Sequence, residues 1–201
     1  MEDNKLTLVD WQIQHLCGDR SYEPQWWNLK ALAHKWLIPS PEYLMIAPYN
    51  LDQVNAASYD VCIGDSVKWA FKPRKYGDWR HDFNTFDLSD GKQMLLHQGD
   101  FILTETIESF HIPRNISAQF ALKSSRGREG YEHLSAGFID PAWHGSKLTM
   151  ELFNANPNPI PIYKGLKIGQ IIFTRTDAQP IKAYDERGRY NNDNGVRESK
   201  G

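Results

Sequence analysis

Short strand-like runs separated by turn residues fill the chain after residue 57, and this pattern restricts the fold more than any other feature. Runs such as SYDVCIG, DFILTETI, SAQFALK, SKLTMELF and IGQIIFT are short, and several alternate between apolar and polar residues. No helix-length pattern lies between them, so a parallel βαβ sheet is disfavoured. The sequence therefore predicts a mainly β fold, a distorted barrel or a sandwich.

The first fifty residues have a different, helical pattern. Asp10 is a suitable N-cap for a short helix that stops at Gly18. A second apolar stripe runs from Trp26 to Leu37 and ends before Pro39. We expect residues 1–50 to form a helical N-terminal segment that packs on the main body, with a subunit contact or a lid as the alternative.

Length, charge and cysteine content exclude several classes of protein. The 201 residues fit one domain, and a 40% hydrophobic fraction supplies a core. The formal net charge is −2, which gives no support for a nucleic-acid-coating protein, and no run of about 18 apolar residues predicts a membrane span. The polar N-terminus does not resemble a signal peptide, and two cysteines cannot staple a secreted scaffold. We expect a cytoplasmic location.

Residues 123–128, KSSRGR, have the composition of a phosphate-binding segment. Two hydroxyls, three cations and a glycine lie within six residues. The spacing is not that of a Walker loop, and a solvated basic turn would have the same composition. The segment is thus a candidate phosphate site.

Two carboxylates downstream are candidates for chemistry. In LTMELF, Thr149 and Glu151 share one strand face and the apolar residues share the other. Glu151 either meets solvent or points into a site. Asp140 lies in the turn GFIDPAW, where capping of local backbone is the alternative role.

Three kinds of catalytic site lack their motifs. The chain has no CxxC, so a zinc-dependent base deaminase is excluded. It has no GxSxG elbow, which disfavours a Ser/His/Asp hydrolase of that type. Its seven histidines are scattered without an HExxH motif, so a histidine-built metal site has little support.

Four segments in series resemble deoxycytidine triphosphate (dCTP) deaminases of the trimeric dUTPase superfamily. The longest is AQFALKSSRGREGYEHLSAGFIDPAWHGSKLTMELFN. The others are AASYDVCIG, HQGDFILTETIESFHIP and the closing YDERGRYNNDNG, all in the family's order. Residues 17–45 look like a longer or divergent insertion. The resemblance implies one dUTPase-like domain over residues 1–201, with a β-barrel core at 54–180 and a flexible tail at 181–201 that closes over the site.

The resemblance also implies an enzyme and its catalytic residues. Hydrolytic, zinc-independent deamination of dCTP to dUTP and ammonia would use Glu151 as the general base, with a pKa raised by burial. Ser124 would hold the water or the C4 substituent, and Arg128 would stabilise the charge-separated intermediate. The active sites would lie between subunits of a homotrimer.

The remaining expected contacts are to the nucleotide. Mg²⁺ would bind through the triphosphate oxygens, and no protein side chain would be its main ligand. Lys123 and Ser125 would touch the phosphates, with Arg126 as a nearby cation. The other predicted substrate-binding residues read the base, the sugar or the phosphates: Ser135, Ala136, Phe138, Asp140, Tyr184, Arg189 and Asp193.

Departures from the family pattern and alternative activities stay open at this point. Lys123 replaces an arginine, so a guanidinium that could bind phosphate through two parallel hydrogen bonds becomes a single ammonium group. Asp193 replaces a glutamine, which leaves base and sugar selectivity, including a modified cytosine, undecided. The alternatives are a bifunctional enzyme or a pure dUTPase, both with Asp140 activating water at the α-phosphate, and a non-catalytic nucleotide-binding regulator.

Overall fold

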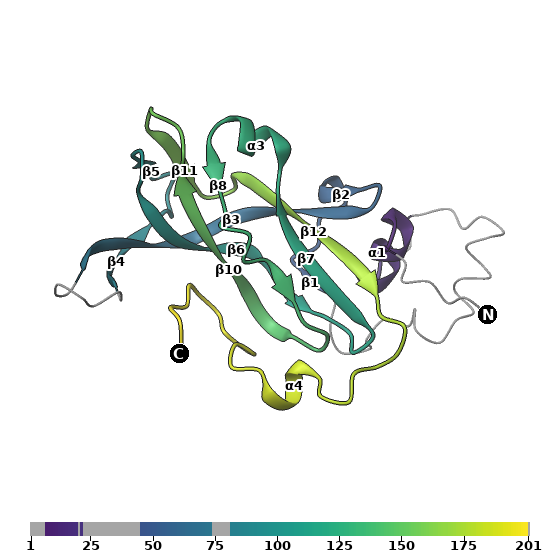
Figure 1. Cartoon of the computed structure of the whole chain (residues 1–201). Coiled ribbons are helices and arrows are strands. Elements are labelled where there is room, and N and C mark those ends of the chain that lie inside the picture. Colours follow the sequence, from purple (N-terminus) through teal and green to yellow (C-terminus); the bar gives the residue numbers. More distant parts are fainter. Residues whose placement is uncertain (1–6, 20, 22–44, 74–80, 201) are drawn as a thin grey trace.

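The computed structural model describes residues 7–19, 21, 45–73 and 81–200, and its regular structure consists mainly of strands (Figure 1). Its helical elements are α1 (Asp10–Leu16), η1 (Leu51–Gln53), α3 (Ser124–Arg128) and α4 (Tyr184–Arg187). The first strands are β1 (Ile46–Ala47), β2 (Val54–Asn55), β3 (Ser58–Pro73), β4 (His81–Asp87), β5 (Gln93–Leu96) and β6 (Phe101–His111). The later strands are β7 (Ile116–Leu122), β8 (Tyr131–Glu132), β9 (Phe138–Ile139), β10 (His144–Asn154), β11 (Ile160–Tyr163) and β12 (Lys167–Arg175).

One long curled sheet contains ten of the described strands, and β5 pairs with β11 in a second, two-stranded sheet. The order of the long sheet is β8-β10-β6-β3-β12-β7-β9, and β1, β2 and β4 attach beside this path. Strand β3 makes the sheet turn, because its first residues pair with β12 and the residues after Ile63 pair with β6 and β4. A register shift between Ile63 and Val67 marks the bend. The mainly β prediction is confirmed.

The core lies inside the curl of this sheet. Tyr59, Phe110 and Phe173 are fully buried and come from β3, β6 and β12. Burial of each such side chain contributes about 1.5–3 kcal/mol. Phe110 also stacks on Trp143 at 5.9 Å between ring centroids, so the core reaches the turn just before β10, the strand that carries Glu151.

The helix at the N-terminus agrees with the sequence except for its cap. Helix α1 begins at Asp10, so Val9 is the N-cap residue, and its N–H donates to Gln12 Oε1 at 3.0 Å. Ile13 and Leu16 bury the apolar face of α1. The predicted helix from Trp26 to Leu37 lies outside the described residues.

Strand β4 runs back along the second half of β3. Strand β4 pairs antiparallel with β3, from Ser66 opposite Asp87 to Ala70 opposite Phe83. Figure 1 shows this pair extending away from the body of the sheet. Among the described residues, no helix is long and apolar enough to cross a membrane.

Candidate active site

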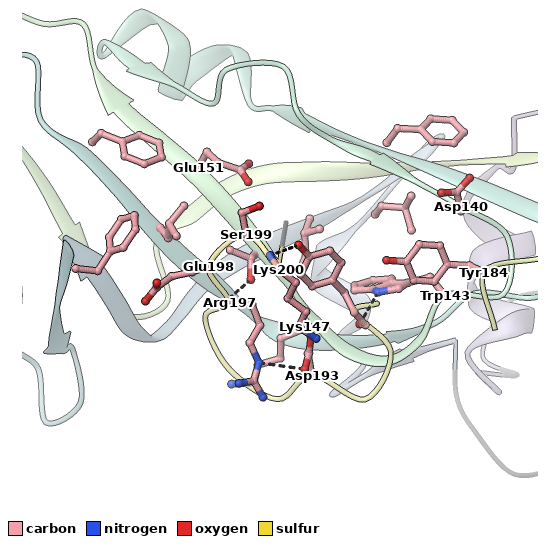
Figure 2. A pocket seen from close by; sticks show the side chains of 18 residues that line it. Asp140, Trp143, Lys147, Glu151, Tyr184, Asp193, Arg197, Glu198, Ser199 and Lys200 are labelled. Atoms are coloured by element: carbon pink, nitrogen blue, oxygen red, sulfur yellow. Dashed lines mark hydrogen bonds and ion pairs between the residues drawn. The ribbon is translucent and has the colours of Figure 1, made fainter. Parts of the chain in front are cut away.

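A pocket of about 880 Å³ lies against β10 and the C-terminal tail, which we define as residues 181–200 (Figure 2). Its walls come from the sheet, from the turn before β10 and from the tail. The lining residues are Phe83, Phe101, Leu103, Phe138, Ile139, Asp140, Trp143, Lys147, Leu148, Thr149, Glu151, Tyr184, Tyr190, Asp193, Arg197, Glu198, Ser199 and Lys200.

Glu151 lies in the wall that the sheet forms. It is directly opposite Leu103 of β6, and the alternation of β10 points its side chain away from the buried Met150 and Leu152. The side chain is half-buried, and this desolvation raises the pKa of Glu151 above the ordinary glutamate value. A carboxylate in this position can accept a proton and return it, as a general base must.

A bulge in β10 brings further side chains to the same wall. The register with β6 shifts between Lys147 and Thr149, and the N–H of Leu148 donates to Thr106 Oγ1 at 3.0 Å. Lys147, Leu148 and Thr149 therefore all line the pocket. Lys147 forms an ion pair with the buried Glu105 at 3.1 Å.

The tail is fixed to the start of β10 by hydrogen bonds around Ser146. This fully buried serine donates from Oγ to the Tyr190 carbonyl at 2.6 Å and accepts from the Asp193 N–H at 3.0 Å. Trp143 Nε1 donates to the same Tyr190 carbonyl at 3.0 Å. The Lys147 N–H donates to the Asp193 carbonyl at 3.1 Å. The tail is thereby placed over the pocket.

Asp193 is buried and bound within the tail. Its carboxylate forms ion pairs with Arg197 at 3.1 Å and with Lys200 at 2.7 Å. Figure 2 shows Ser199 next to Glu151 and the pair of Arg197 and Asp193 further away. If Asp193 contacts the nucleotide as predicted, its carboxylate must therefore share Arg197 and Lys200 with the nucleotide or release them to it.

Asp140 lies at the other end of the pocket, beside Tyr184, far from Glu151 (Figure 2). The N–H of Tyr184 donates to the carbonyl of Pro141, which fixes the tail next to Asp140. Arg189 lies with Asp140 and Tyr184 around a smaller adjoining hollow. The two candidate carboxylates, Asp140 and Glu151, thus line the same pocket at opposite ends.

The predicted residues 123–128 do not line this pocket. Lys123 precedes α3, and its Nζ binds Asp60 at 2.5 Å. Ser124, Ser125 and Arg128 are exposed, whereas Arg126 forms an ion pair with Glu129. Within one chain, the predicted phosphate-binding segment at residues 123–128 therefore lies outside the pocket that contains the two candidate carboxylates, Glu151 and Asp140.

The segment predicted to read the base is an exposed turn. Ser135 and Ala136 are exposed and do not line the pocket, whereas Phe138 lines it although two thirds of its surface is exposed. Leu134 and Ser135 both have left-handed backbone, with φ values of 54° and 57°. Two adjacent non-glycine residues in this region store strain, which is typical of functional turns.

Several pocket residues were not singled out as site residues from the sequence. Thr149 lies on the same strand face as Glu151, so the alternation of β10 could have predicted that it lines the pocket. Trp143 and Lys147 have no such signal, because their position depends on the turn and on the bulge. For a resident metal, the described residues contain no group of three or more His, Cys, Asp or Glu side chains that would hold one.

The sequence model of the dCTP deaminase-like family matches residues 32–176. The chain belongs to this family. A relative from Methanospirillum hungatei, named "dCTP deaminase, dUMP-forming", is 35% identical over 67% of this chain and 75% of its own length. A relative of the same name from Corynebacterium jeikeium is 37% identical over 66% of this chain and 74% of its own length.

Comparison with solved structures supports the fold expected for the family. The crystal structure of 2′-deoxycytidine 5′-triphosphate deaminase from Agrobacterium tumefaciens has a TM-score of 0.55 and 22% identity, and it covers 85% of this chain. The present chain spans about half, 48%, of that chain. This likeness confirms that the chain has the mainly β fold of that deaminase, as the sequence predicts.

Proposed function

We propose that this chain is a dCTP deaminase that hydrolyses the C4 amino group of the nucleotide and releases ammonia. The observation that carries the proposal is Glu151, a half-buried carboxylate with a raised pKa in the wall of a nucleotide-sized pocket. Membership of the dCTP deaminase-like family supports this choice of substrate.

In the proposed reaction, Glu151 carries one proton from water to the leaving amine. The carboxylate accepts a proton as the water oxygen bonds to C4, and the resulting carboxylic acid protonates the amino nitrogen as the C4–N bond breaks. The raised pKa of Glu151 suits both halves of this exchange. Ser124 would hold the water or the C4 substituent, and Arg128 would stabilise the developing charge.

The separation of Glu151 from residues 123–128 supports an active site shared between copies. Because Ser124 and Arg128 are exposed and absent from the pocket wall, we propose that the α3 segment of a neighbouring copy completes each site. A closed ring of three copies would satisfy every site at once. We therefore propose a homotrimer with active sites between its subunits.

The triphosphate would lie against the neighbouring α3 segment and beneath the tail. Lys123, Ser125 and Arg126 would contact the phosphates, and Mg²⁺ would bind through the phosphate oxygens. Tyr184 and Arg189 are placed by the tail, which we propose closes over the sugar and phosphates. Asp140 and the turn at Ser135 would contact the sugar and the base.

For the final product, the names of the relatives favour dUMP over dUTP. The expectation from the sequence was dUTP, with dUMP as the alternative. A second hydrolysis, in which Asp140 activates water at the α-phosphate, converts dUTP to dUMP and pyrophosphate. The position of Asp140 at the far end of the pocket from Glu151 supports two separate proton acceptors (Figure 2).

Product analysis tests the proposal directly. The purified chain is incubated with dCTP and Mg²⁺, and ammonia, dUTP, dUMP and pyrophosphate are measured together. We expect ammonia with dUMP and pyrophosphate, and accumulation of dUTP in the Asp140→Asn variant. Ammonia with dUTP alone would contradict the second step, and tight nucleotide binding without any ammonia would favour a regulator.

A further inference from the structure

A buried carboxylate, Asp60, lies between two lysines that neighbouring strands bring together. Only 5% of Asp60 is exposed. Its Oδ1 accepts from Lys123 Nζ at 2.5 Å and from Asn55 Nδ2 at 2.8 Å. Its Oδ2 lies 3.7 Å from Lys167 Nζ, which is too long for a hydrogen bond but short enough for an ion pair.

The pairing of three strands explains this arrangement. Strands β3, β12 and β7 are adjacent, and Lys167 is opposite Cys62, two residues beyond Asp60. The end of β7 brings Lys123 to the same edge, and the Lys123 N–H donates to the Ile168 carbonyl at 3.1 Å. Both the backbone and the ammonium group of Lys123 are therefore fixed, although its side chain is still a quarter exposed.

Two lysines form ion pairs with the one carboxylate of Asp60. A buried carboxylate is costly unless it is paired, and Lys123 alone would neutralise it. Lys167 adds a second cation whose side chain is 44% exposed. Among the described residues, its ammonium contacts Asp60 and donates a 3.3 Å hydrogen bond to the Asp52 carbonyl. Lys167 is therefore the more exposed cation at the edge where Ser124 and Ser125 follow Lys123, whereas the nearby Glu108 carboxylate is buried and bound by Gln53 Nε2 and the Cys62 N–H.

We propose that Asp60 is a positioning residue that orients Lys123 for the nucleotide triphosphate, and that Lys167 is a further triphosphate-binding cation. This inference rests on the proposed function, which supplies the ligand. A lysine is a flexible point charge, so a buried partner that fixes it in advance lowers the cost of ordering it on binding. Lys167 is held loosely enough to turn from Asp60 to a phosphate.

The test compares binding of dCTP and dCMP, because only the triphosphate reaches the proposed cations. Binding is measured by calorimetry with Mg²⁺ in the full-length Glu151→Gln chain, which prevents turnover. We expect Asp60→Asn to weaken dCTP binding about tenfold and Lys167→Gln about threefold to tenfold, with dCMP changed by less than about twofold. Lys164→Gln is the matched control, since Lys164 is equally exposed and pairs with Asp65 at 2.5 Å.

The ratio of the two affinities separates positioning from a structural role. If both variants bind dCTP and dCMP more weakly by the same factor, or bind both as before, the ratio of the two affinities is unchanged. That result would overturn the inference. If Asp60→Asn fails to fold in a thermal melt, the ratio for the exposed Lys167→Gln decides alone. If neither nucleotide binds and the wild-type chain releases no ammonia, the proposed function fails and this inference fails with it; dCTP binding without the expected discrimination overturns only the inference.

Discussion

The pocket around Glu151 and the segment at residues 123–128 differ in how completely one chain builds them. The pocket has strand walls, a bulge and a docked tail, and Ser146 fixes that tail by bonds to Tyr190 and Asp193. The α3 segment instead exposes Ser124 and Arg128, and Lys123 just before it pairs with Asp60. One region is a pocket with walls from a single chain, and the other is an exposed surface segment.

This difference indicates how the work is divided in the proposed reaction. A general base needs a partly dry environment to raise its pKa, and the sheet supplies that within one chain. Groups that grip a triphosphate are charged and hydrated, so they stay exposed until a ligand or another copy covers them. We therefore expect changes in the two regions to have different effects.

The largest effect is expected at Glu151. Glu151→Gln removes the proposed proton carrier of the deamination step and should lower ammonia release by about 10³-fold or more, while dCTP binding stays within about threefold. Single-turnover ammonia assays and calorimetry measure the two quantities. Glu132→Gln, at an exposed position in β8, is the control. Turnover retained by Glu151→Gln would refute the role of this carboxylate.

A smaller loss is expected at Arg128. Arg128→Ala removes a cation that stabilises developing charge, so kcat should fall about 100-fold without loss of the fold. Steady-state kinetics and a thermal melt measure these effects, with Lys92→Ala as an exposed control. A normal kcat in Arg128→Ala would mean that the α3 segment is not part of the site.

Loss of the tail anchor should have a moderate effect. Ser146→Ala leaves the Asp193 N–H and the Tyr190 carbonyl without their buried partner, which costs about 1–3 kcal/mol. We expect KM for dCTP to rise about tenfold as tail docking weakens. Initial rates over a range of dCTP concentrations measure this, with Ser89→Ala as the control. An unchanged KM would show that docking of the tail does not contribute to binding.

The smallest expected effect is a shift of the acid limb in the pH profile of kcat/KM. The proposed base must be ionised, so activity falls as pH drops through its pKa, and burial raises this pKa above the ordinary 4.5. The acid limb of kcat/KM should therefore lie above pH 4.5. A pH–rate profile measures it after stability at each pH is checked. A limb at or below 4.5 would contradict a desolvated base.

The sequence predicted what depends on local pattern. Alternation in LTMELF placed Thr149 and Glu151 on one face, and both line the pocket. The predicted N-cap of α1, Asp10, was wrong by one residue. The N-cap is Val9, whose backbone N–H donates to Gln12 Oε1, so no polar side chain is needed at this position. Boundaries of this kind depend on single hydrogen bonds.

Long-range contacts could not be predicted. The docking of the tail depends on Ser146, whose partners lie more than forty residues away in sequence. The bulge that turns Lys147 into the pocket depends on Thr106 of the facing strand. The pairing of Lys123 with Asp60 joins residues 63 positions apart. None of these contacts leaves a periodic signal in the chain.

Subunit complementation tests the division between the two regions most directly. Glu151→Gln and Arg128→Ala chains are each assayed alone, then mixed in equal amounts under conditions that allow subunit exchange. If each site takes Glu151 from one copy and Arg128 from its neighbour, random trimers contain about one quarter intact sites. We predict recovery of about a quarter of wild-type ammonia release; a mixture no more active than its components would contradict the shared site.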